Sequence, residues 1–537
     1  MLKTRESGIL AHITSLYSDY GIGDLGKTSF DFVDFLSKGD QRVWQILPIN
    51  PTSFGDSPYQ SFSTFAGNPL MICPIELAKM GLLSIEDIEL DYIFPDRHVD
   101  YGLVFEFKEA IFRCAYKNFK DQGGYLSRKY LEFVDEAAFW LDDYALFVAI
   151  KWHFIDERRN FLPSNPEYKE FVQKNHKYLS KDEVADYFYG AVWLSWPEEL
   201  RTYDKAALAF WGDSLADDIE YHKFLQYIFF KQFAAVCTYA AKNDVRIIGD
   251  IPIFVALDSA DCWSAPHLFQ LGKNGTPQAV AGVPPDYFSE DGQLWGNPLY
   301  DWEAHKADGY KWWISRLRWG LKHMDGLRID HFIGFERNYA IAFGAQSAKN
   351  GKWQRGPSTD FFAAVQKALG DLPIIAEDLG VLTPAVEALR DKFSLPGMKV
   401  LQFGFDSLED NPNLPHNFAT PNCVVYSGTH DNNTSAGWYD EADEDLRDYF
   451  RRYASVSGND AAWDMMRLAF LSIAKLAIVP IQDVCSLGAA YRMNRPGIAS
   501  DNWQFRLRKD DLRDELADGL AYLARLSHRV AVGSVVK

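Results

Sequence analysis

Four carboxylates stand where short apolar runs of the chain end. They are Asp250 in IIGDIP, Asp330 in LRIDHF, Glu377 in IIAEDLG and Asp431 in YSGTHDNN. An acid at a strand end often caps the next helix, and that reading stays open for each acid alone; Asp378 fits it better than Glu377. Together, four acids on different strands would repel one another and their pKa values would be pushed apart. The set suits acid–base and nucleophilic chemistry on a glycosidic bond.

The neighbours of these acids indicate further roles. Arg328 lies two residues before Asp330, and an extended strand places both side chains on one face. There the cation would keep Asp330 ionised and nucleophilic, although a structural ion pair is the alternative. His331 would point to the opposite face and serve the structure. His12 and His430 could donate hydrogen bonds to sugar hydroxyls, and a core histidine is an equal reading for His12.

Other chemistries have weaker support in the sequence. Acid clusters can bind calcium, but the spacing of an EF-hand is absent. The acidic run Asp440–Asp445 is more typical of a solvated helix start. A GxSxG motif is absent, which argues against a nucleophilic serine. We therefore expect no metal and no other cofactor.

The elements that must position the acids follow a regular pattern. Eight short β-rich runs occur, mostly separated by amphipathic helical stretches: Gly8–Ile13, Val43–Ile49, Val245–Phe254, Gly326–Phe332, Pro373–Asp378, Met398–Phe403, Cys423–Tyr426 and Ala477–Ile481. This alternation predicts an α/β fold with a parallel sheet, and eight strands favour a closed (β/α)8 TIM barrel over an open doubly wound sheet. In such a barrel the carboxyl ends of the strands meet at one mouth, which would gather the acids.

Two long interruptions must fold as insertions in what we expect to be a single catalytic barrel domain over residues 1–537. Residues 51–218 are too many for a loop, and their pattern predicts a mainly helical subdomain. Residues 256–303 are rich in Gly and Pro, and their prolines forbid a regular helix over Gly282–Pro298. We expect an ordered loop there that carries aromatic residues and acts as a lid over the active site.

The composition of the chain limits the classes of binding partner and the cellular compartment that can be expected. With 47% hydrophobic and 24% charged residues the chain is of ordinary globular type, and its net charge of −19 argues against nucleic acid or an anionic membrane surface as partner. The many Trp and Tyr residues suit stacking against flat faces of a neutral ligand. Six scattered cysteines without a CxxC motif predict reduced thiols. The N-terminus lacks the apolar run of a signal peptide, and we expect a cytoplasmic protein.

Long motifs surround the four acids and stand in a characteristic order. They are SGILAHITSLYSDYGIGDLG (Ser7–Gly26), GDSPYQSFSTFAGNPL (Gly55–Leu70), GDIPIFVALDSADCW (Gly249–Trp263), GVPPDYFSEDGQLWGNPLYDW (Gly282–Trp302), DGLRIDHFIGF (Asp325–Phe335), IIAEDLGVLTP (Ile374–Pro384), GTHDNNTSAGW (Gly428–Trp438) and MNRPGIASDNW (Met493–Trp503). Through them the chain resembles, nearly end to end, the 4-α-glucanotransferases called amylomaltase or disproportionating enzyme, in glycoside hydrolase family 77. It departs from their usual pattern at Ile13, Ile333 and Asn338.

The resemblance implies the fold, the reaction and the roles of matching residues. It implies a barrel enzyme that moves a segment of an α-1,4-glucan to the 4-hydroxyl of glucose, a maltooligosaccharide or another glucan. Asp330 would be the nucleophile, Glu377 the general acid/base, and Asp431 a third carboxylate that holds hydroxyls of the distorted sugar. The further residues implied are Tyr59, Asp250, Arg328 and His430 around the attacked glucose, Ser57 close to it, Asp406 on the acceptor side, and Tyr287, Phe288 and Trp295 in the lid.

Three alternatives remain beside this interpretation. A net α-glucan hydrolase would use the same carboxylates and would give no longer oligomers. A glycan-binding protein without catalysis is disfavoured, because Asp330, Glu377 and Asp431 are all present. A metal-dependent isomerase on the same kind of barrel would lose activity when its metal is chelated.

Overall fold

The eight predicted runs form one parallel sheet. The structure is a computed structural model that describes residues 4–52, 54–90, 92–161, 192–285, 290–380, 382–405, 410–498 and 501–530. The strands are β1 (Glu6–Leu10), β2 (Val43–Gln45), β3 (Arg246–Ile251), β6 (Gly326–Ile329), β9 (Ile374–Ala376), β10 (Gly397–Val400), β11 (Cys423–Tyr426) and β12 (Leu476–Pro480). Their order in the sheet is β10-β11-β12-β1-β2-β3-β6-β9. This order follows the chain around a circle, as in a barrel.

The sheet is nearly closed into that barrel. Between its two outer strands, the backbone N–H of Ala376 in β9 donates to the carbonyl of Pro396 at 2.9 Å, just before β10. The (β/α)8 barrel prediction is confirmed, and the open doubly wound sheet is wrong, because the strand order never reverses. Where β1 passes β2, a Cβ on Gly8 would lie 2.3 Å from the carbonyl oxygen of Val43, so glycine is needed for this close approach.

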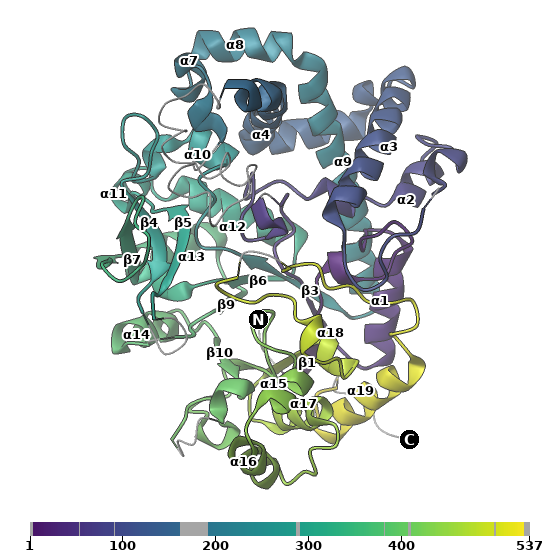
Figure 1. Ribbon diagram of the computed structural model, residues 1–537, viewed down its shortest axis with the longest axis vertical. Coiled ribbons are helices and arrows are strands. Elements are labelled where there is room, and N and C mark those ends of the chain that lie inside the picture. Colours follow the sequence, from purple (N-terminus) through teal and green to yellow (C-terminus); the bar gives the residue numbers. More distant parts are fainter. Residues whose placement is uncertain are drawn as a thin grey trace.

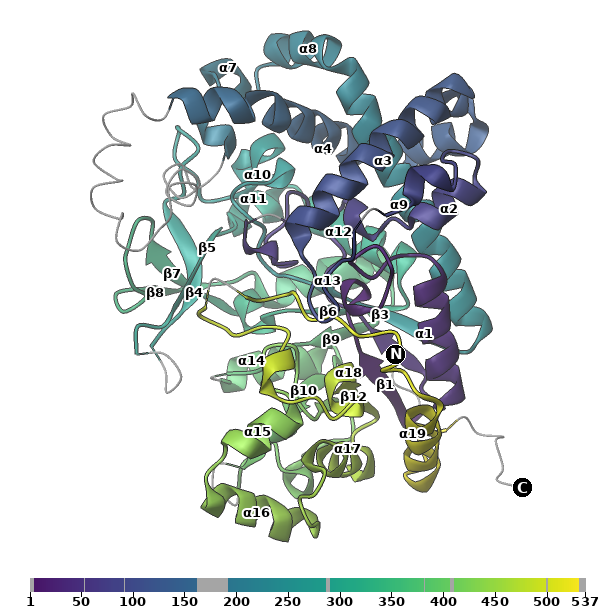
Figure 2. The ribbon, with the colours of Figure 1, turned by 45° about the vertical axis from the view of Figure 1, so that its right-hand side comes forward.

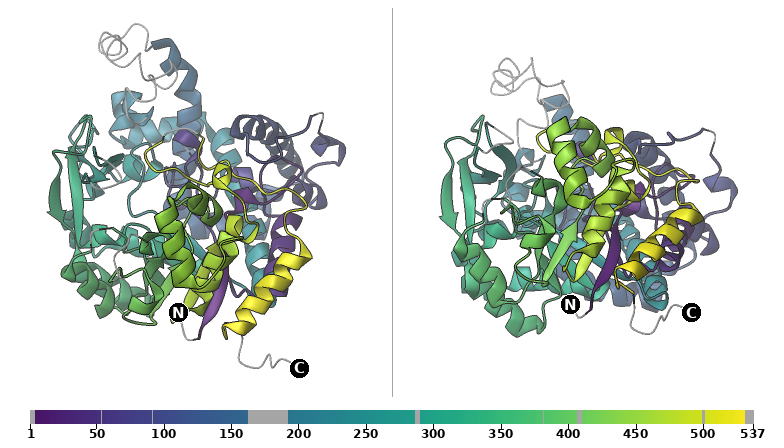
Figure 3. Two further views of the ribbon diagram at one scale, coloured as in Figure 1. Left: turned by 60° about the horizontal axis from the view of Figure 1, so that its bottom comes forward. Right: turned by 90° about the horizontal axis from the view of Figure 1, so that it is seen from below.

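Helices surround the barrel (Figure 1). They are α1 (Lys27–Lys38), α9 (Ala216–Lys242), α12 (Lys311–His323), α13 (Ser358–Leu369), α14 (Pro384–Lys392), α15 (Ser435–Glu441), α16 (Glu444–Ala454), α17 (Ala461–Leu471), α18 (Ile481–Val484) and α19 (Asp514–Leu526). In α1, for example, Phe32, Val33 and Leu36 are buried. Seen from below, α19 lies beside β1, which brings the last described helix back to the first strand (Figure 3).

Between β2 and β3 the described elements are helical. They include α2 (Pro74–Lys79), α3 (Tyr101–Asp121), α4 (Arg128–Phe161), α7 (Glu198–Arg201) and α8 (Lys205–Ser214), which lie together at the top of Figures 1 and 2. Asp100 caps α3 by accepting from the N–H of Leu103 at 3.0 Å. The buried ammonium of Lys108 donates to the carbonyls of Leu70 and Ile72, at 2.6 and 2.8 Å, which fixes α3 to the chain that leaves β2.

A second sheet stands beside the barrel (Figure 2). It contains β4 (Ala279–Val283), β5 (Gln293–Pro298), β7 (Arg337–Ala342) and β8 (Lys352–Arg355), all antiparallel in the order β5-β4-β7-β8. The expectation of a loop over Gly282–Pro298 is therefore wrong at both ends, which lie in β4 and β5. Pro298 is tolerated because β5 is an edge strand, where a missing N–H costs no ladder bond. The flanking α10 (Ala260–Ser264) and α11 (Trp302–Ala307) connect this sheet to the barrel.

Other expectations from the sequence can be compared with individual features of the structure. Asp443 caps α16 by accepting from the N–H of Leu446 at 2.9 Å, so the acidic run does contain a helix start. All six cysteines are free thiols. In the described part of the chain, no helix has both the length and the apolar character needed to cross a membrane.

Candidate active site

The four carboxylates come together at the carboxyl ends of their strands. Asp250 lies within β3, Asp330 and Glu377 directly follow β6 and β9, and Asp431 lies in the turn after β11. The strands β3, β6 and β9 are neighbours in the sheet. Burial raises the pKa of Asp330 well above its usual range; the charge of Arg328 opposes this rise, and the charges of the other three acids add to it.

Arg328 joins two of these acids. Its Nη1 donates to both carboxylate oxygens of Asp250, at 2.8 and 2.6 Å, and its Nη2 lies 3.0 Å from Oδ1 of Asp330. The side chains of Arg328 and Asp250 are 3% and 0% exposed, whereas that of Asp330 is 29% exposed. The prediction that Arg328 and Asp330 share a face is confirmed. Asp330 combines a direct cation partner with access from outside.

Glu377 is held by two backbone N–H groups. Its Oε2 accepts from the N–H of His331 at 2.6 Å, and its Oε1 accepts from the N–H of Leu379 at 2.9 Å. Burial raises the pKa of Glu377, while Arg328 and these two hydrogen bonds oppose the rise. Each oxygen keeps a lone pair beyond the one used by its N–H, so the carboxyl can still exchange a proton with a ligand.

Asp431 is oriented by a segment far along the chain. Asn494 donates from Nδ2 to Oδ1 of Asp431 at 2.6 Å, and Arg492 donates to the Asp431 carbonyl at 3.0 Å. The ring of His430 lies beside it, with Nε2 3.4 Å from Oδ2 of Asp431. Burial lowers the pKa of His430, so the imidazole is neutral near pH 7 and can donate a hydrogen bond to a hydroxyl group.

Aromatic rings line the same mouth. Tyr59 stacks on His430 with centroids 5.2 Å apart, and Trp503 contacts both rings. The Tyr59 hydroxyl donates to Oδ2 of Asp250 at 2.7 Å, which connects the ring to the arginine–carboxylate cluster. Ser57 supports Tyr59, because its Oγ accepts from the Tyr59 N–H at 3.2 Å.

Trp295 reaches the mouth from the second sheet. It is half-buried on β5, and its ring meets the edge of the His331 ring at 4.9 Å between centroids. Gln60, next to Tyr59, donates to the Trp295 carbonyl and to Oδ1 of Asn297, at 3.4 and 3.1 Å. The second sheet is thereby fixed to the loop that carries Tyr59.

The remaining predictions have mixed outcomes. Asp406, Tyr287 and Phe288 lie outside the described residues. His12 is buried, burial lowers its pKa to about 3, and its Nδ1 has no hydrogen-bond partner in the described part of the chain. Asp378 does not cap the next helix: it accepts from the N–H of Met398 at 2.7 Å and pairs with Arg390 at 2.6 Å.

Sequence reasoning missed three contributors to this site. His331 was expected to face away as a structural residue, yet its backbone N–H holds Glu377; its φ of 48° ends the strand and turns the peptide. Asn494 and Trp503 belong to the last of the quoted motifs, but nothing in their types shows that they contact Asp431 and Tyr59. A backbone N–H that donates a hydrogen bond cannot be recognised from the residue type. The rare MNRPGIASDNW motif, in contrast, could have indicated that Asn494 and Trp503 belong to the site.

Ile13 and Ile333 are both buried, at 0% and 5% exposure. Asn338, the third departure from the usual family pattern, is buried as well, at 2% exposure.

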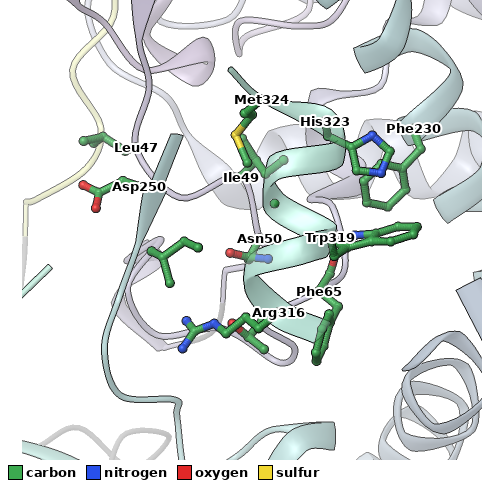
Figure 4. Close-up of a pocket in the computed structure, with 13 residues that line it drawn as sticks. Leu47, Ile49, Asn50, Phe65, Phe230, Asp250, Arg316, Trp319, His323 and Met324 are labelled. Carbon is green, nitrogen blue, oxygen red and sulfur yellow. The ribbon is translucent and has the colours of Figure 1, made fainter. Parts of the chain in front are cut away.

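A cavity of about 30 Å³ lies behind the site, between β3 and α12 (Figure 4). Its lining includes Asp250, Arg316, Trp319 and His323. In Figure 4 the carboxylate of Asp250 lies on the other side of its strand from α12 and points away from the helix. This cavity has room for about one water molecule, so it is a gap between barrel and helices and not a substrate site.

Comparison with known proteins identifies the family. The sequence model of glycoside hydrolase family 77, described as 4-alpha-glucanotransferase, matches residues 11–512. The chain belongs to this family. A 4-alpha-glucanotransferase of Synechocystis is 44% identical over 98% of this chain and 99% of its own length, and one of Thermus thermophilus is 42% identical over 98% and 99%. The amylomaltase from Streptococcus agalactiae, solved in complex with acarbose, has a TM-score of 0.88 at 37% identity, over 98% of this chain and all of its own.

This chain is therefore an enzyme, a 4-alpha-glucanotransferase, whose reaction is transglycosylation on α-glucans. The expectation drawn from the motifs is confirmed, and net hydrolysis is not favoured.

Proposed function

We propose that the enzyme cuts an α-1,4-glucan and passes the donor segment to the 4-hydroxyl of glucose, a maltooligosaccharide or another glucan, with Asp330 as nucleophile and Glu377 as general acid/base. The observation that carries these roles is the contact between Arg328 and Asp330 at 3.0 Å, next to a Glu377 without a cation partner among the described residues. The single negative charge of the pair then resides on Asp330, and the proton on Glu377.

In the first step, an oxygen of Asp330 attacks the anomeric carbon of the donor glucose while Glu377 gives its proton to the leaving glycosidic oxygen. The bond from that carbon to oxygen breaks, and a covalent β-glycosyl ester forms on Asp330. In the second step, the ionised Glu377 takes the proton from the acceptor 4-hydroxyl, whose oxygen attacks the same carbon and releases Asp330. Two inversions restore the α linkage.

The other site residues would hold the attacked glucose. Asp431, fixed by Asn494, and the neutral His430 would accept and donate hydrogen bonds to hydroxyls of the ring as it flattens. The ring of Tyr59 would cover an apolar face of that sugar, close to Ser57. Arg328 and Asp250 would fix the nucleophile and are too deeply buried to move far.

The acceptor side would be formed by Trp295 with Tyr287 and Phe288 as a lid, and by Asp406. The half-buried Trp295 ring against His331 supports this placement. Closure of these aromatic groups over the acceptor would exclude water from the glycosyl ester, and transfer would then prevail over hydrolysis.

We also propose the organisation and setting of the enzyme. Residues 1–537 form one catalytic barrel domain, with insertions at about 51–218 and 256–303, the first mainly helical and the second lid-bearing. The protein acts in the cytoplasm, without a nucleic-acid or membrane partner. No step requires a metal or cofactor, so dialysis against EDTA is expected to leave transfer unchanged; a loss that calcium restores without a change in thermal stability would contradict this.

Incubation with pure maltotriose tests the reaction. We expect a ladder of longer oligomers together with glucose, because each transfer releases a small sugar and lengthens another. Asp330→Asn is the matched inactive control, since it keeps the shape of the side chain. Accumulation of glucose and maltose alone would show a net hydrolase instead.

A further inference from the structure

A second cavity lies away from the carboxylates, in the helical insertion. It has a volume of about 220 Å³ and lies between α3, α4 and the start of α9. Its lining comprises Arg113, Ala149, Trp152, His153, Asp218 and His222. None of these residues takes part in the mechanism above, so the polar groups that line the cavity have no assigned task.

His222 marks this cavity as suited to a ligand. It is 7% exposed, and it is one of the residues that line the cavity. Burial lowers its pKa to about 3, so the imidazole is neutral near pH 7 and offers one donor and one acceptor. A neutral imidazole that lines a cavity can therefore both donate to and accept from a hydroxyl group of a ligand.

Among the described residues that line the cavity, the one cation is already paired. Arg113 donates from Nε to Oε1 of Glu109 at 2.8 Å and from Nη1 to Oδ1 of Asp218 at 2.9 Å. Its guanidinium also lies 3.7 Å from the centroid of the Tyr221 ring. The cation is fixed in place and already paired with two carboxylates, so the cavity favours a neutral polar ligand over a phosphate.

An aromatic platform borders these polar groups. Trp152 is 44% exposed, and Phe105 is 41% exposed and stacks against it with centroids 5.6 Å apart at 22°. Rigid, accessible rings beside paired hydrogen-bonding groups are the combination that binds a sugar, whose flat face is apolar and whose rim carries hydroxyls.

We propose that this cavity binds a glucosyl unit of a long α-glucan, as a docking site separate from the catalytic mouth. The sugar stacks on Trp152, and its hydroxyls bond to His222, Asp218 and Arg113. The start of α3 touches the mouth, because the Tyr101 hydroxyl donates to the Trp503 carbonyl at 3.0 Å. From Tyr101 to Arg113 the helix rises roughly 18 Å, so a single long chain can reach both places while maltotriose cannot.

Affinity electrophoresis in gels that contain amylose tests this site. The measurements use Asp330→Asn protein, which binds glucan without turnover, with and without Trp152→Ala or His222→Gln. We expect either second substitution to weaken the apparent amylose affinity at least about 3-fold, as expected for one stacking or hydrogen-bonding contact. Tyr522→Ala removes a still more exposed aromatic residue, 68% against 44% for Trp152, from α19 and should change nothing.

The same substitutions in the active enzyme separate this proposal from the catalytic one. Trp152→Ala should leave the kcat/KM for maltotriose unchanged while it raises the KM for amylose. Unchanged amylose affinity in both variants would overturn the docking site, and so would an equal loss with maltotriose. Inorganic phosphate should not compete with amylose; competition that depends on Arg113 would replace the glucan site with an anion site. If wild-type enzyme did not convert maltotriose at all, the proposed function would fail instead.

Discussion

The backbone N–H of His331 donates to Oε2 of Glu377 at 2.6 Å, across the neighbouring strands β6 and β9. His331 directly follows Asp330, so the peptide after the proposed nucleophile also holds the proposed acid/base. The separation of the two carboxyl groups is then set by backbone and not by flexible side chains. Such fixed geometry lets two acids with one proton between them act in turn.

The pH dependence of transfer should report this pair. Activity is lost as pH falls and Asp330 becomes protonated, and it is lost as pH rises and Glu377 loses its proton. Burial raises the pKa of both carboxyls, so both limbs of the kcat/KM profile should lie above those of solvated Asp and Glu, at about 3.9 and 4.3. With an α-glucosyl fluoride donor, the formation of the ester by Glu377→Gln enzyme should keep the acid limb and lack the alkaline one. An alkaline limb that persisted in this variant would assign the proton to another group.

Asn494 should act through Asp431. Asn494→Ala removes the 2.6 Å hydrogen bond and leaves the carboxylate free to turn, so kcat for maltotriose should fall about 10- to 100-fold with a smaller change in KM. A double-mutant cycle tests whether Asn494 acts through Asp431. In an Asp431→Asn background the same substitution should cost little more, because the group it positions is already altered. Additive losses would show that Asn494 has a role of its own.

The strands and the acids could be predicted from the sequence because both are local signals. Each barrel strand is a short, largely buried run, mostly between helical stretches, and each acid lies near the end of such a run or in the turn after it. The antiparallel sheet could not be predicted in the same way. β8, with the sequence KWQR, is largely exposed and carries no apolar pattern, and β4 pairs with β7 more than fifty residues later. The pairing of the strands in this antiparallel sheet is decided by tertiary contacts.

Within the site, the sequence indicated which side chains could do chemistry, but it did not indicate which groups hold those side chains in position. The Arg328–Asp330 contact follows from a spacing of two on a strand. The N–H of His331 has the same chemistry at any residue, and its direction depends on a left-handed φ that the sequence does not disclose. Asn494 reaches Asp431 from 63 residues away, and the two residues lie in the segments that follow the neighbouring strands β12 and β11.

Trp295 should control the balance between transfer and hydrolysis. Trp295→Ala removes the ring that lies against His331, so water should reach the glycosyl ester more often. The ratio of transfer to hydrolysis should fall about 2- to 10-fold, the equivalent of one aromatic contact. Leu294→Ala, the neighbour on β5, alters the opposite face of the strand and should leave the ratio unchanged. Equal ratios of transfer to hydrolysis in the two variants would show that Trp295 does not act as part of a lid.

Arg529 should be a major source of stability at the opposite end of the barrel. It is fully buried after α19 and donates to the carbonyls of Glu6, Phe470 and Ala474 at 2.8–2.9 Å, which joins β1 to the start of β12. Arg529→Met should leave these acceptors unpaired and lower the free energy of unfolding by about 3 kcal/mol or more. Arg525→Ala, which breaks an exposed pair with Asp40, should cost at most about 1 kcal/mol. The thermal unfolding midpoints of the two variants, measured by calorimetry, test this prediction. Similar midpoints would contradict the stabilising role of Arg529.

The division of labour between Asp330 and Glu377 can be tested by trapping the covalent intermediate. The retaining route requires their carboxyl groups about 5–5.5 Å apart. Asp330→Asn should lower transfer on the order of 10⁴-fold or more, because no nucleophile remains. Glu377→Gln should still react with an α-glucosyl fluoride, whose leaving group needs little acid, and should then stall because nothing activates the acceptor. Mass spectrometry of a digest should find the sugar on the peptide that contains Asp330. A sugar on Glu377 or Asp431, or a first product of β configuration, would overturn the assignment.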